Sequence, residues 1–247
     1  PTAQVAVGGV ILPSPLRLQW LDMVMAEYQS RYGVPMPVDV WSIHMQMVNE
    51  VSCDYDPNWC WGAGIPRGVE AGHGIIMTLA DNANLTLFEQ LVRAMRTWMN
   101  ARGQRNKPLI ISEYGVLMPS TYICDCEDPA VGDAIISNFM TRTFQFLLTA
   151  TDPNTGHPPD GNRLVQRWMW YTLNDEPYNP ETEEGFNGAL FDYRNNVYPG
   201  TLTVFGEAFK SFVPPLKAPY RDVVPAGLRA GLLDPAAAGP QCQPGTA

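Results

Sequence analysis

Residues 107–115 read KPLIISEYG, a short apolar run that begins beside a proline and ends at a carboxylate. Apolar runs of this length are typical of strands that are covered on both faces, as in parallel sheets. A charge at the end of a buried strand costs several kcal/mol to desolvate unless partners compensate. Glu113 is therefore a candidate catalytic residue, and the alternatives are a structural salt bridge or a cap for the next loop.

Other segments of the chain share this strand-like composition, because they are apolar and rich in β-branched or aromatic residues. They are residues 4–12 (QVAVGGVIL), 38–44 (VDVWSIH) and 164–173 (LVQRWMWYTL). A long loop, from residue 45 to about 83, follows the second of them. Loops of this length are uncommon unless they serve a site, so we expect this loop to border one.

A helical pattern follows each strand-like segment. Ser14 as N-cap and Gly33 as the terminating residue predict a first helix. The sequence TLFE at 86–89 resembles a capping box and predicts the start of a second helix. Asp128, before a proline, predicts the N-cap of a third, and a small hairpin is expected within 188–200.

Four successive strand-then-helix units predict an α/β fold with parallel strands and right-handed crossovers. A closed (βα)8 TIM barrel needs eight such units, so residues 1–213 have the pattern of only four of them. A doubly wound open sheet is the alternative, although no Gly-rich phosphate loop follows any strand. Residues 214–247 are rich in Pro, Ala and Gly and predict a linker or tail.

Composition narrows the classes of partner. The chain has 247 residues, 45% of them hydrophobic, and a formal net charge of −9. An acidic chain without a Lys/Arg cluster is a poor match for nucleic acid, and no apolar run is long enough to span a bilayer. The first residues lack the pattern of a signal peptide, and no cofactor motif was found. We therefore expect no nucleic acid, membrane or cofactor.

Four cysteines lie in two short segments, and their state is open on sequence grounds. Cys53 and Cys60 are close together, and so are Cys124 and Cys126. Disulfides, free thiols and a four-thiolate zinc site all fit the spacing. A Cys-x-Cys pair is awkward to close on itself, so we expect Cys124 and Cys126 to bond to other partners. Cys242, alone in the tail, is expected to be unpaired.

Taken together, these segments resemble the carboxyl-terminal half of clan A (βα)8 barrel glycoside hydrolases. AVGGVILPSP resembles their fifth strand, VDVWSIH the sixth with its strand-end His44, KPLIISEYG the seventh, and RWMWYTLNDE the eighth with its active-site tryptophan. The ending GALFDYRNNVYPGTLTVFGEAF is also similar. The resemblance covers residues 5 to 212, and it implies that Glu113 is the nucleophile of a retaining mechanism.

Two departures from the clan pattern bear on the chemistry. The clan often has an aromatic hydroxyl two residues after the histidine, where it hydrogen-bonds the nucleophile, and this chain has Gln46 there. The clan's acid/base glutamate ends the fourth strand in an Asn-Glu pair, whereas this chain starts at what resembles strand five. Asn49-Glu50 spells the pair, six residues past His44, and Glu50 is the candidate acid/base within the chain. We expect the acid/base to lie upstream in a longer protein.

The retaining mechanism requires two carboxyl groups about 5–5.5 Å apart, and aromatic rings suit the apolar faces of sugars. Core packing is the competing interpretation for the tryptophans, Trp59 included, and a solvated acidic loop for Asp175. His73 and His157 suggest no catalytic triad. The candidate substrate-binding residues are His44, Gln46, Trp61, Tyr114, Trp168, Trp170 and Asp175.

The sequence therefore predicts a retaining hydrolase of a β-linked glycan or glycoside, located outside the cell or at its surface. A non-catalytic carbohydrate-binding half barrel that dimerises is the first rival, and a zinc-stabilised interaction domain is the second. The expected partners are a carbohydrate substrate and either a second copy of the chain or a missing amino-terminal half. An isolated half barrel would expose its inner face and an open strand edge.

Overall fold

The computed structural model describes residues 3–182, 184–194 and 200–213. The chain separates into a compact unit, Pro1–Phe209, and a second unit, Lys210–Ala247. The predicted tail at 214–247, including Cys242, lies outside the described residues. Within the described part of the chain, no helix is long and apolar enough to cross a membrane.

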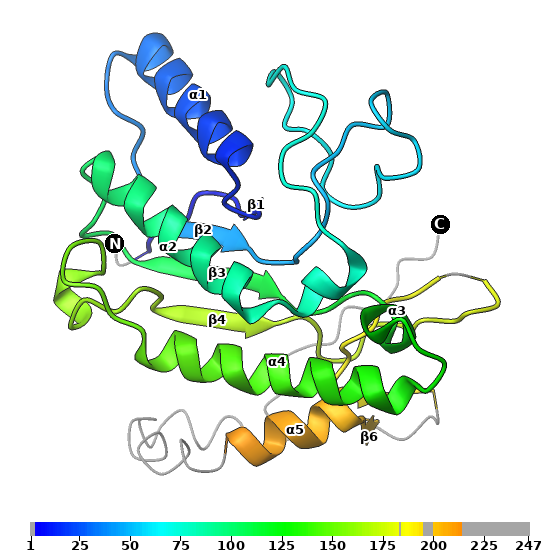
Figure 1. Cartoon of the computed structure of the whole chain (residues 1–247). Helices are drawn as coiled ribbons and strands as arrows, with labels where there is room; N and C mark the ends of the chain where they lie inside the picture. Colours follow the sequence, from blue (N-terminus) through cyan, green and yellow to red (C-terminus); the bar gives the residue numbers. More distant parts are fainter. Residues whose placement is uncertain (1–2, 183, 195–199, 214–247) are drawn as a thin grey trace, which may run out of the picture. The chain divides into compact units, whose positions relative to one another are not determined.

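A four-stranded parallel sheet forms the centre of the first unit (Figure 1). Its strands are β1 (Val10–Ile11), β2 (Trp41–His44), β3 (Leu109–Tyr114) and β4 (Arg167–Trp170). Spatial order follows chain order, and every neighbouring pair is parallel. A doubly wound sheet reverses its strand order at a switch point, and these four strands contain no such reversal. The parallel α/β fold is confirmed, and closure into a barrel stays a prediction.

The first and last strands are shorter than the sequence predicts. Of residues 4–12 only Val10–Ile11 forms a strand, with one isolated bridge from Ala6 to Val40. This segment is the edge of the sheet, so it has a neighbour on one side only. The fourth strand narrows from 164–173 to Arg167–Trp170.

Helices connect the strands and bury their outward-facing side chains. They are α1 (Pro15–Tyr32), α2 (Leu85–Ala101), α3 (Ser120–Cys124), α4 (Pro129–Thr149) and α5 (Val204–Phe212), with 3-10 turns η1 (Leu79–Ala83) and η2 (Pro158–Asp160). The short strands β5 (Phe191–Asp192) and β6 (Thr201–Leu202) pair antiparallel, in the region where a hairpin was expected.

The capping predictions are mostly confirmed. Ser14 caps α1 by accepting from the backbone N–H of Arg17, Gly33 ends that helix at φ 70°, and Asp128 caps α4. The capping box predicted at 86–89 is wrong. The N-cap of α2 is Asn84, whose side-chain oxygen accepts from the N–H of Leu87, so TLFE lies inside the helix.

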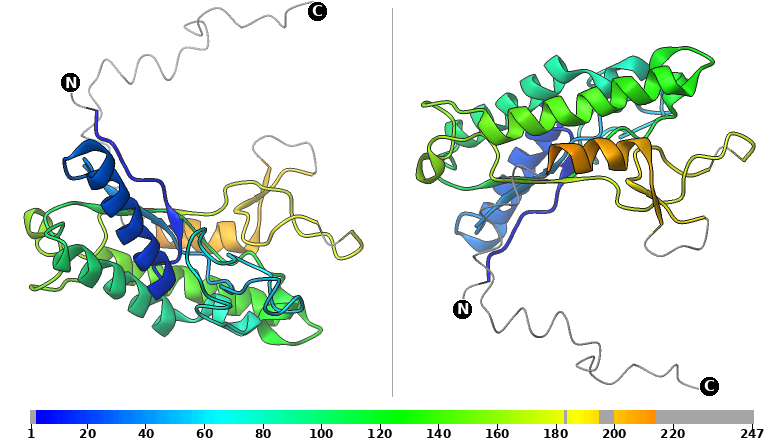
Figure 2. Two further views of the ribbon diagram at one scale, coloured as in Figure 1. Left: turned by 90° about the horizontal axis from the view of Figure 1, so that it is seen from above. Right: turned by 90° about the horizontal axis from the view of Figure 1, so that it is seen from below.

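Helices pack against one face of the sheet, and the opposite face is more exposed. In Figures 1 and 2, α2 and α4 lie on the same side of the sheet. Side chains on that side are buried, as Trp41 is against Trp98, with ring centroids 4.9 Å apart. On the opposite side Ser42 and Ser112 share a hydrogen bond of 2.8 Å, while Met169 is 53% exposed. The core therefore lies between sheet and helices, and the opposite face is only partly covered.

Candidate active site

Glu113 stands at the carboxyl end of β3, directly beside the end of β2. The register pairs it with His44, after an irregularity between Ile43 and His44. Its carbonyl accepts a hydrogen bond of 2.8 Å from the N–H of Met45. The backbone of Glu113 is thus held by its hydrogen bond to the segment after β2. It lies at the carboxyl-terminal edge of the parallel sheet, where functional side chains are commonly found.

The Glu113 carboxylate is held along one side and open on the other. Its Oε2 lies 3.6 Å from His44 Nδ1 and accepts a 3.4 Å hydrogen bond from Gln46 Nε2. The Glu113 side chain is 43% exposed, against 23% for His44. This arrangement orients the group without closing it to a ligand, and it confirms that His44 and Gln46 lie beside Glu113.

The exposed side of Glu113 faces a hollow of about 630 Å³. This volume is within the range of small-molecule sites. The hollow, called the Glu113 pocket below, is lined by Ile11, His44, Gln46, Val48, Gly62, Glu113, Leu117, Met118, Pro119, Tyr171, Tyr178, Gly185 and Phe186. A larger hollow, about 830 Å³, runs along α1, and the described residues that line it all belong to that helix. It contains no strand-end residue, so the chemistry is expected in the Glu113 pocket.

Two glycines allow the strand ends to approach closely. A Cβ at Gly9 would stand 2.4 Å from Cδ2 of His44, so any side chain at this position, directly before β1, would displace the imidazole. A Cβ at Gly115 would stand 2.3 Å from the carbonyl oxygen of Tyr171. Because Gly9 and Gly115 have no side chain, His44 and the backbone of Tyr171 can occupy their positions on either side of Glu113.

Tyr171, immediately after β4, is a pocket residue that the sequence analysis missed. Its hydroxyl donates a 2.5 Å hydrogen bond to Asp175 Oδ2. This bond, partial burial and the charges of Asp175 and Glu113 raise the pKa of Tyr171 to about 12. The phenol therefore stays protonated at neutral pH, and Asp175 is connected to the pocket through it rather than by lining it.

The structure contradicts the substrate-binding prediction for Tyr114, Trp168 and Trp170. Tyr114 is fully buried, and burial raises the pKa of its hydroxyl well above its usual range. Trp168 and Trp170 pair in register with Ile111 and Tyr114, both buried on the helix side. None of the three is among the residues that line the Glu113 pocket.

Trp170 has structural contacts that account for its position. Its ring lies 5.3 Å from that of Tyr114 and 6.2 Å from that of Phe144, and its Nε1 donates to the carbonyl of Gly188 at 2.8 Å. The period-two alternation from Trp168 and Trp170 could have shown that Tyr171 points the other way. The expected active-site tryptophan of the last strand is thus replaced in the pocket by Tyr171.

The loop between β2 and η1 forms another wall of the pocket. Gly62 and Val48 line the pocket, whereas the neighbouring Trp61 is half-buried and does not line it. Asn49 organises the loop, since its Oδ1 accepts from Met77 N–H at 2.6 Å and its backbone carbonyl accepts from Ala63 N–H at 2.7 Å. The prediction that this long loop borders the site is confirmed, although Trp61 is not among the contact residues.

Glu50 lies inside the protein and is not among the residues that line the pocket. Its side chain is 1% exposed. Oε1 accepts from Ser14 Oγ at 2.8 Å and from Arg17 Nε at 3.1 Å, while Oε2 accepts from Ile75 N–H at 3.3 Å. Arg17 also donates to the carbonyls of Ala63 and Gly64. These contacts tie α1 to the loop, and they leave no open side for a substrate.

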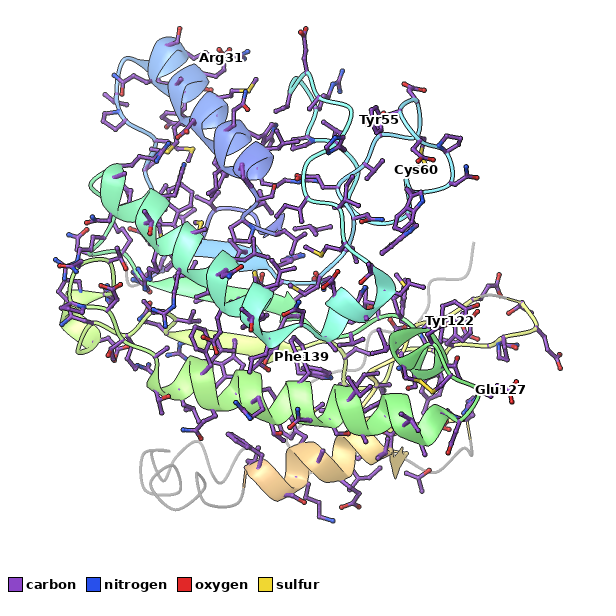
Figure 3. All side chains as sticks on the ribbon, viewed as in Figure 1. Arg31, Tyr55, Cys60, Tyr122, Glu127 and Phe139 are labelled. Atoms are coloured by element: carbon purple, nitrogen blue, oxygen red, sulfur yellow. A yellow bond between two sulfur atoms is a disulfide. The ribbon has the colours of Figure 1, made fainter. Side chains whose placement is uncertain are left out.

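The cysteines form two local disulfides, Cys53–Cys60 and Cys124–Cys126. The expectation that Cys124 and Cys126 bond to other partners is therefore wrong, because the left-handed turn at Asp125 brings the two side chains together. Figure 3 places Cys60 on the long loop, near Tyr55. Because all four thiols are bonded in these disulfides, the zinc alternative loses its ligands.

Comparisons with known proteins find similarity to a solved structure but none to a family model. No family model matches the sequence, and no curated protein matches it. Among solved structures, the chain is similar to a GH128 (subgroup I) endo-β-1,3-glucanase from Amycolatopsis mediterranei in complex with laminarihexaose. The sequences are 14% identical, the TM-score is 0.43, and the match covers 84% of this chain and 58% of the other. The chain thus spans less than two thirds of that enzyme's length.

Glu50→Ala should destabilise the fold by about 3–5 kcal/mol, because it leaves Arg17 charged and buried without its partner. Urea unfolding measures the change. Glu27→Ala, which breaks the exposed Arg31–Glu27 pair on the same helix, is the matched control and should cost at most about 1 kcal/mol. Equal stability of Glu50→Ala and wild type would show that the buried pair does not hold the loop.

Tyr171 should titrate near pH 12, as NMR of ring-labelled tyrosine can measure. Asp175→Ala removes the hydrogen-bond acceptor and a negative charge, so the pKa of Tyr171 should fall toward about 10. Because the pKa of Tyr171 is higher in the folded protein than in the unfolded chain, the protonated phenol contributes to folding stability. This contribution is fully present below a pH of about 10 and is lost as the pH rises toward 12. Tyr171→Phe identifies the signal, and titration near pH 10 in the wild type would contradict this geometry.

Proposed function

We propose that this chain supplies the nucleophile of a retaining glycoside hydrolase that acts on a β-linked glycan or glycoside. The observation that supports it most is the setting of Glu113, a strand-end carboxylate that is 43% exposed in a pocket of about 630 Å³. His44 and Gln46 orient the carboxylate from one side. A nucleophile needs this combination of a fixed orientation and an open approach.

In the proposed first step, an oxygen of Glu113 attacks the anomeric carbon while the bond to the leaving oxygen breaks. The bonding electron pair goes to the leaving oxygen, which takes a proton from a general acid. Water then displaces Glu113 after losing its proton to the same acid/base group. Tyr171 lines the same pocket as Glu113, and the Gln46 amide donates a hydrogen bond to the carboxylate, so both lie where the reacting sugar would be bound.

Aromatic side chains support a sugar as the ligand. Tyr171, Tyr178 and Phe186 all line the Glu113 pocket. Their rings offer flat apolar faces to the CH groups of a pyranose, and hydroxyl groups at the ring edges offer hydrogen bonds. We also propose a location outside the cytosol, because the two disulfides suit an oxidising compartment.

The general acid is proposed to come from outside these four βα units. Among the described residues that line the pocket, Glu113 is the one carboxylate. Glu50 is engaged by Ser14 and Arg17, so we assign it a structural role instead of acid/base catalysis. A second carboxyl about 5–5.5 Å from Glu113 is what the mechanism requires.

Exposed apolar side chains on two surfaces support the proposal that further βα units complete the barrel. On the inner face of the sheet Met169 is 53% exposed, and on α1 Met23 and Tyr32 are 40% and 64% exposed. Among the described strands, β1 has a neighbour on one side only. An added strand and helix would cover the free edge of β1 and the flank of α1 together, as the preceding unit of a (βα)8 barrel does.

A covalent trap tests the nucleophile without needing the general acid. A 2-deoxy-2-fluoro β-glycoside with an activated aryl leaving group needs little protonation to react, and fluorine slows hydrolysis of the glycosyl-enzyme. We expect a panel of such glycosides to include one that adds a single fluoroglycosyl group, mapped to Glu113 by peptide mass spectrometry. Glu113→Gln should not be labelled, and Glu50→Gln should be. Labelling elsewhere, or none with any sugar of the panel, would contradict the assignment.

Sedimentation velocity tests the bare surfaces. A second copy of the chain can supply four more βα units, so we expect the isolated chain to dimerise at micromolar concentration. Met169→Lys should weaken the dimer by at least about 10-fold, because it places a charge on the inner face. Val131→Lys, on the exposed side of α4, is the matched control and should leave it unchanged. A soluble, rigid monomer would count against a half barrel.

A further inference from the structure

A second hollow, of about 410 Å³, is lined by a tyrosine that contacts a tyrosine of the Glu113 pocket. It is lined by Leu79, Thr121, Tyr122, Asp125, Cys126 and Glu127. The ring of Tyr122 lies 6.3 Å from that of Tyr178, which lines the Glu113 pocket, with an angle of 61° between the planes. Figure 3 shows Tyr122 and Glu127 at α3, on the side of the sheet where the strand arrows end. The two tyrosines therefore connect the hollows.

Hydrogen bonds of Asn187 join the segments of the chain that carry the two tyrosines. The backbone N–H of Asn187 donates to the carbonyl of Leu117 at 2.9 Å. The side chain of Asn187 donates to the carbonyl of Met118 and to Ser120 Oγ, each at 3.0 Å. These bonds join the loop after β4 to the loop after β3. The segment that leads into α3 and Tyr122 is thus bonded to the loop that contains Tyr178.

Close packing and a disulfide hold α3 in place from the other side. A Cβ at Gly132 of α4 would stand 1.9 Å from the carbonyl oxygen of Ser120, so α3 and α4 touch at the backbone. Ser120 Oγ also donates to Asp133. The Cys124–Cys126 disulfide closes the turn that carries Asp125 into the second hollow. Because a preformed site loses little entropy on binding, this region is suited to bind a ligand.

The charges around both hollows have one sign. Asp125 and Glu127 line the second hollow, and Glu113 lines the first. No lysine or arginine is among the described residues that line either one. Carboxylates accept hydrogen bonds from sugar hydroxyl groups, but they repel carboxylated or sulfated sugars, and His44 is the one group that can carry a positive charge.

We propose that the second hollow is a distal subsite for an uncharged oligosaccharide, which stacks on Tyr122 and Tyr178 while its reacting unit lies at Glu113. This inference rests on the proposed function and adds to it a substrate class: a neutral glycan chain of several units. A short glycoside occupies the Glu113 pocket alone and lacks the contacts with Tyr122 and Asp125.

Calorimetric titration of the Glu113→Gln chain tests the subsite without turnover. The probes are neutral oligosaccharides of two to six units, in β-1,3- and β-1,4-linked glucose and β-1,4-linked mannose and xylose series. We expect one series to bind at least about 10-fold more tightly at five or six units than at two, a gain of about 1.4 kcal/mol. Oligogalacturonates of matched length should bind at least about 10-fold more weakly than that series.

Variants of Tyr122 separate stacking from other causes. Adding Tyr122→Ala should reduce the gain with length to about 2-fold or less, while leaving the affinity for two units unchanged. Tyr122→Phe should restore the gain, because the ring remains. Tyr193→Ala, which removes an exposed tyrosine that lines neither hollow, is the matched control and should change nothing.

The outcomes distinguish this inference from the proposed function. A gain with length that survives Tyr122→Ala, the absence of any gain, or equal binding of oligogalacturonates would overturn the distal subsite, whatever the covalent trap shows. A gain that depends on Tyr122, together with no labelling of Glu113, would support the subsite and reject the hydrolase.

Discussion

The pairing of the ends of β2 and β3 determines which side chains share the pocket. His44 stands opposite Glu113 in the register, and the N–H of Met45 is bonded to the carbonyl of Glu113. The register is irregular between Ile111 and Glu113, so Glu113, two residues after the buried Ile111, faces the pocket, and the next residue, Tyr114, enters the core between sheet and helices. A slip by one residue would bury the carboxylate and expose the tyrosine, and the site would be lost.

Features that depend on neighbouring residues in the sequence, such as strands and helix caps, were predicted. The face of the sheet to which a given side chain points was not. The parallel strands, the caps of α1 and α4 and the neighbours of Glu113 at the end of β2 follow from residue type and spacing. Trp168 and Trp170 were placed in the site by resemblance, but their in-register partners Ile111 and Tyr114 put them in the core. Tyr171, Tyr178 and the Tyr122 hollow depend on how separate loops meet, which no local pattern of this chain indicates.

Asn49 and Glu50 illustrate how the same two residue types serve different purposes. In the clan that the sequence resembles, such a pair ends a strand and performs acid/base catalysis. Here Asn49 bonds the backbone of its own loop, and Glu50 forms a buried ion pair with Arg17. A buried carboxylate with all its neighbours satisfied is well placed to hold a loop, and poorly placed to exchange protons with a substrate.

The central claim is that Glu113 is a nucleophile that approaches the anomeric carbon from the pocket side. Chemical rescue tests it most directly, by supplying azide to the Glu113→Gly chain together with an activated aryl β-glycoside. The account predicts that azide fills the space of the missing carboxylate and restores release of the aryl group, giving an α-glycosyl azide that NMR identifies by its anomeric signal. Release that does not depend on azide, or a β-configured product, would contradict it.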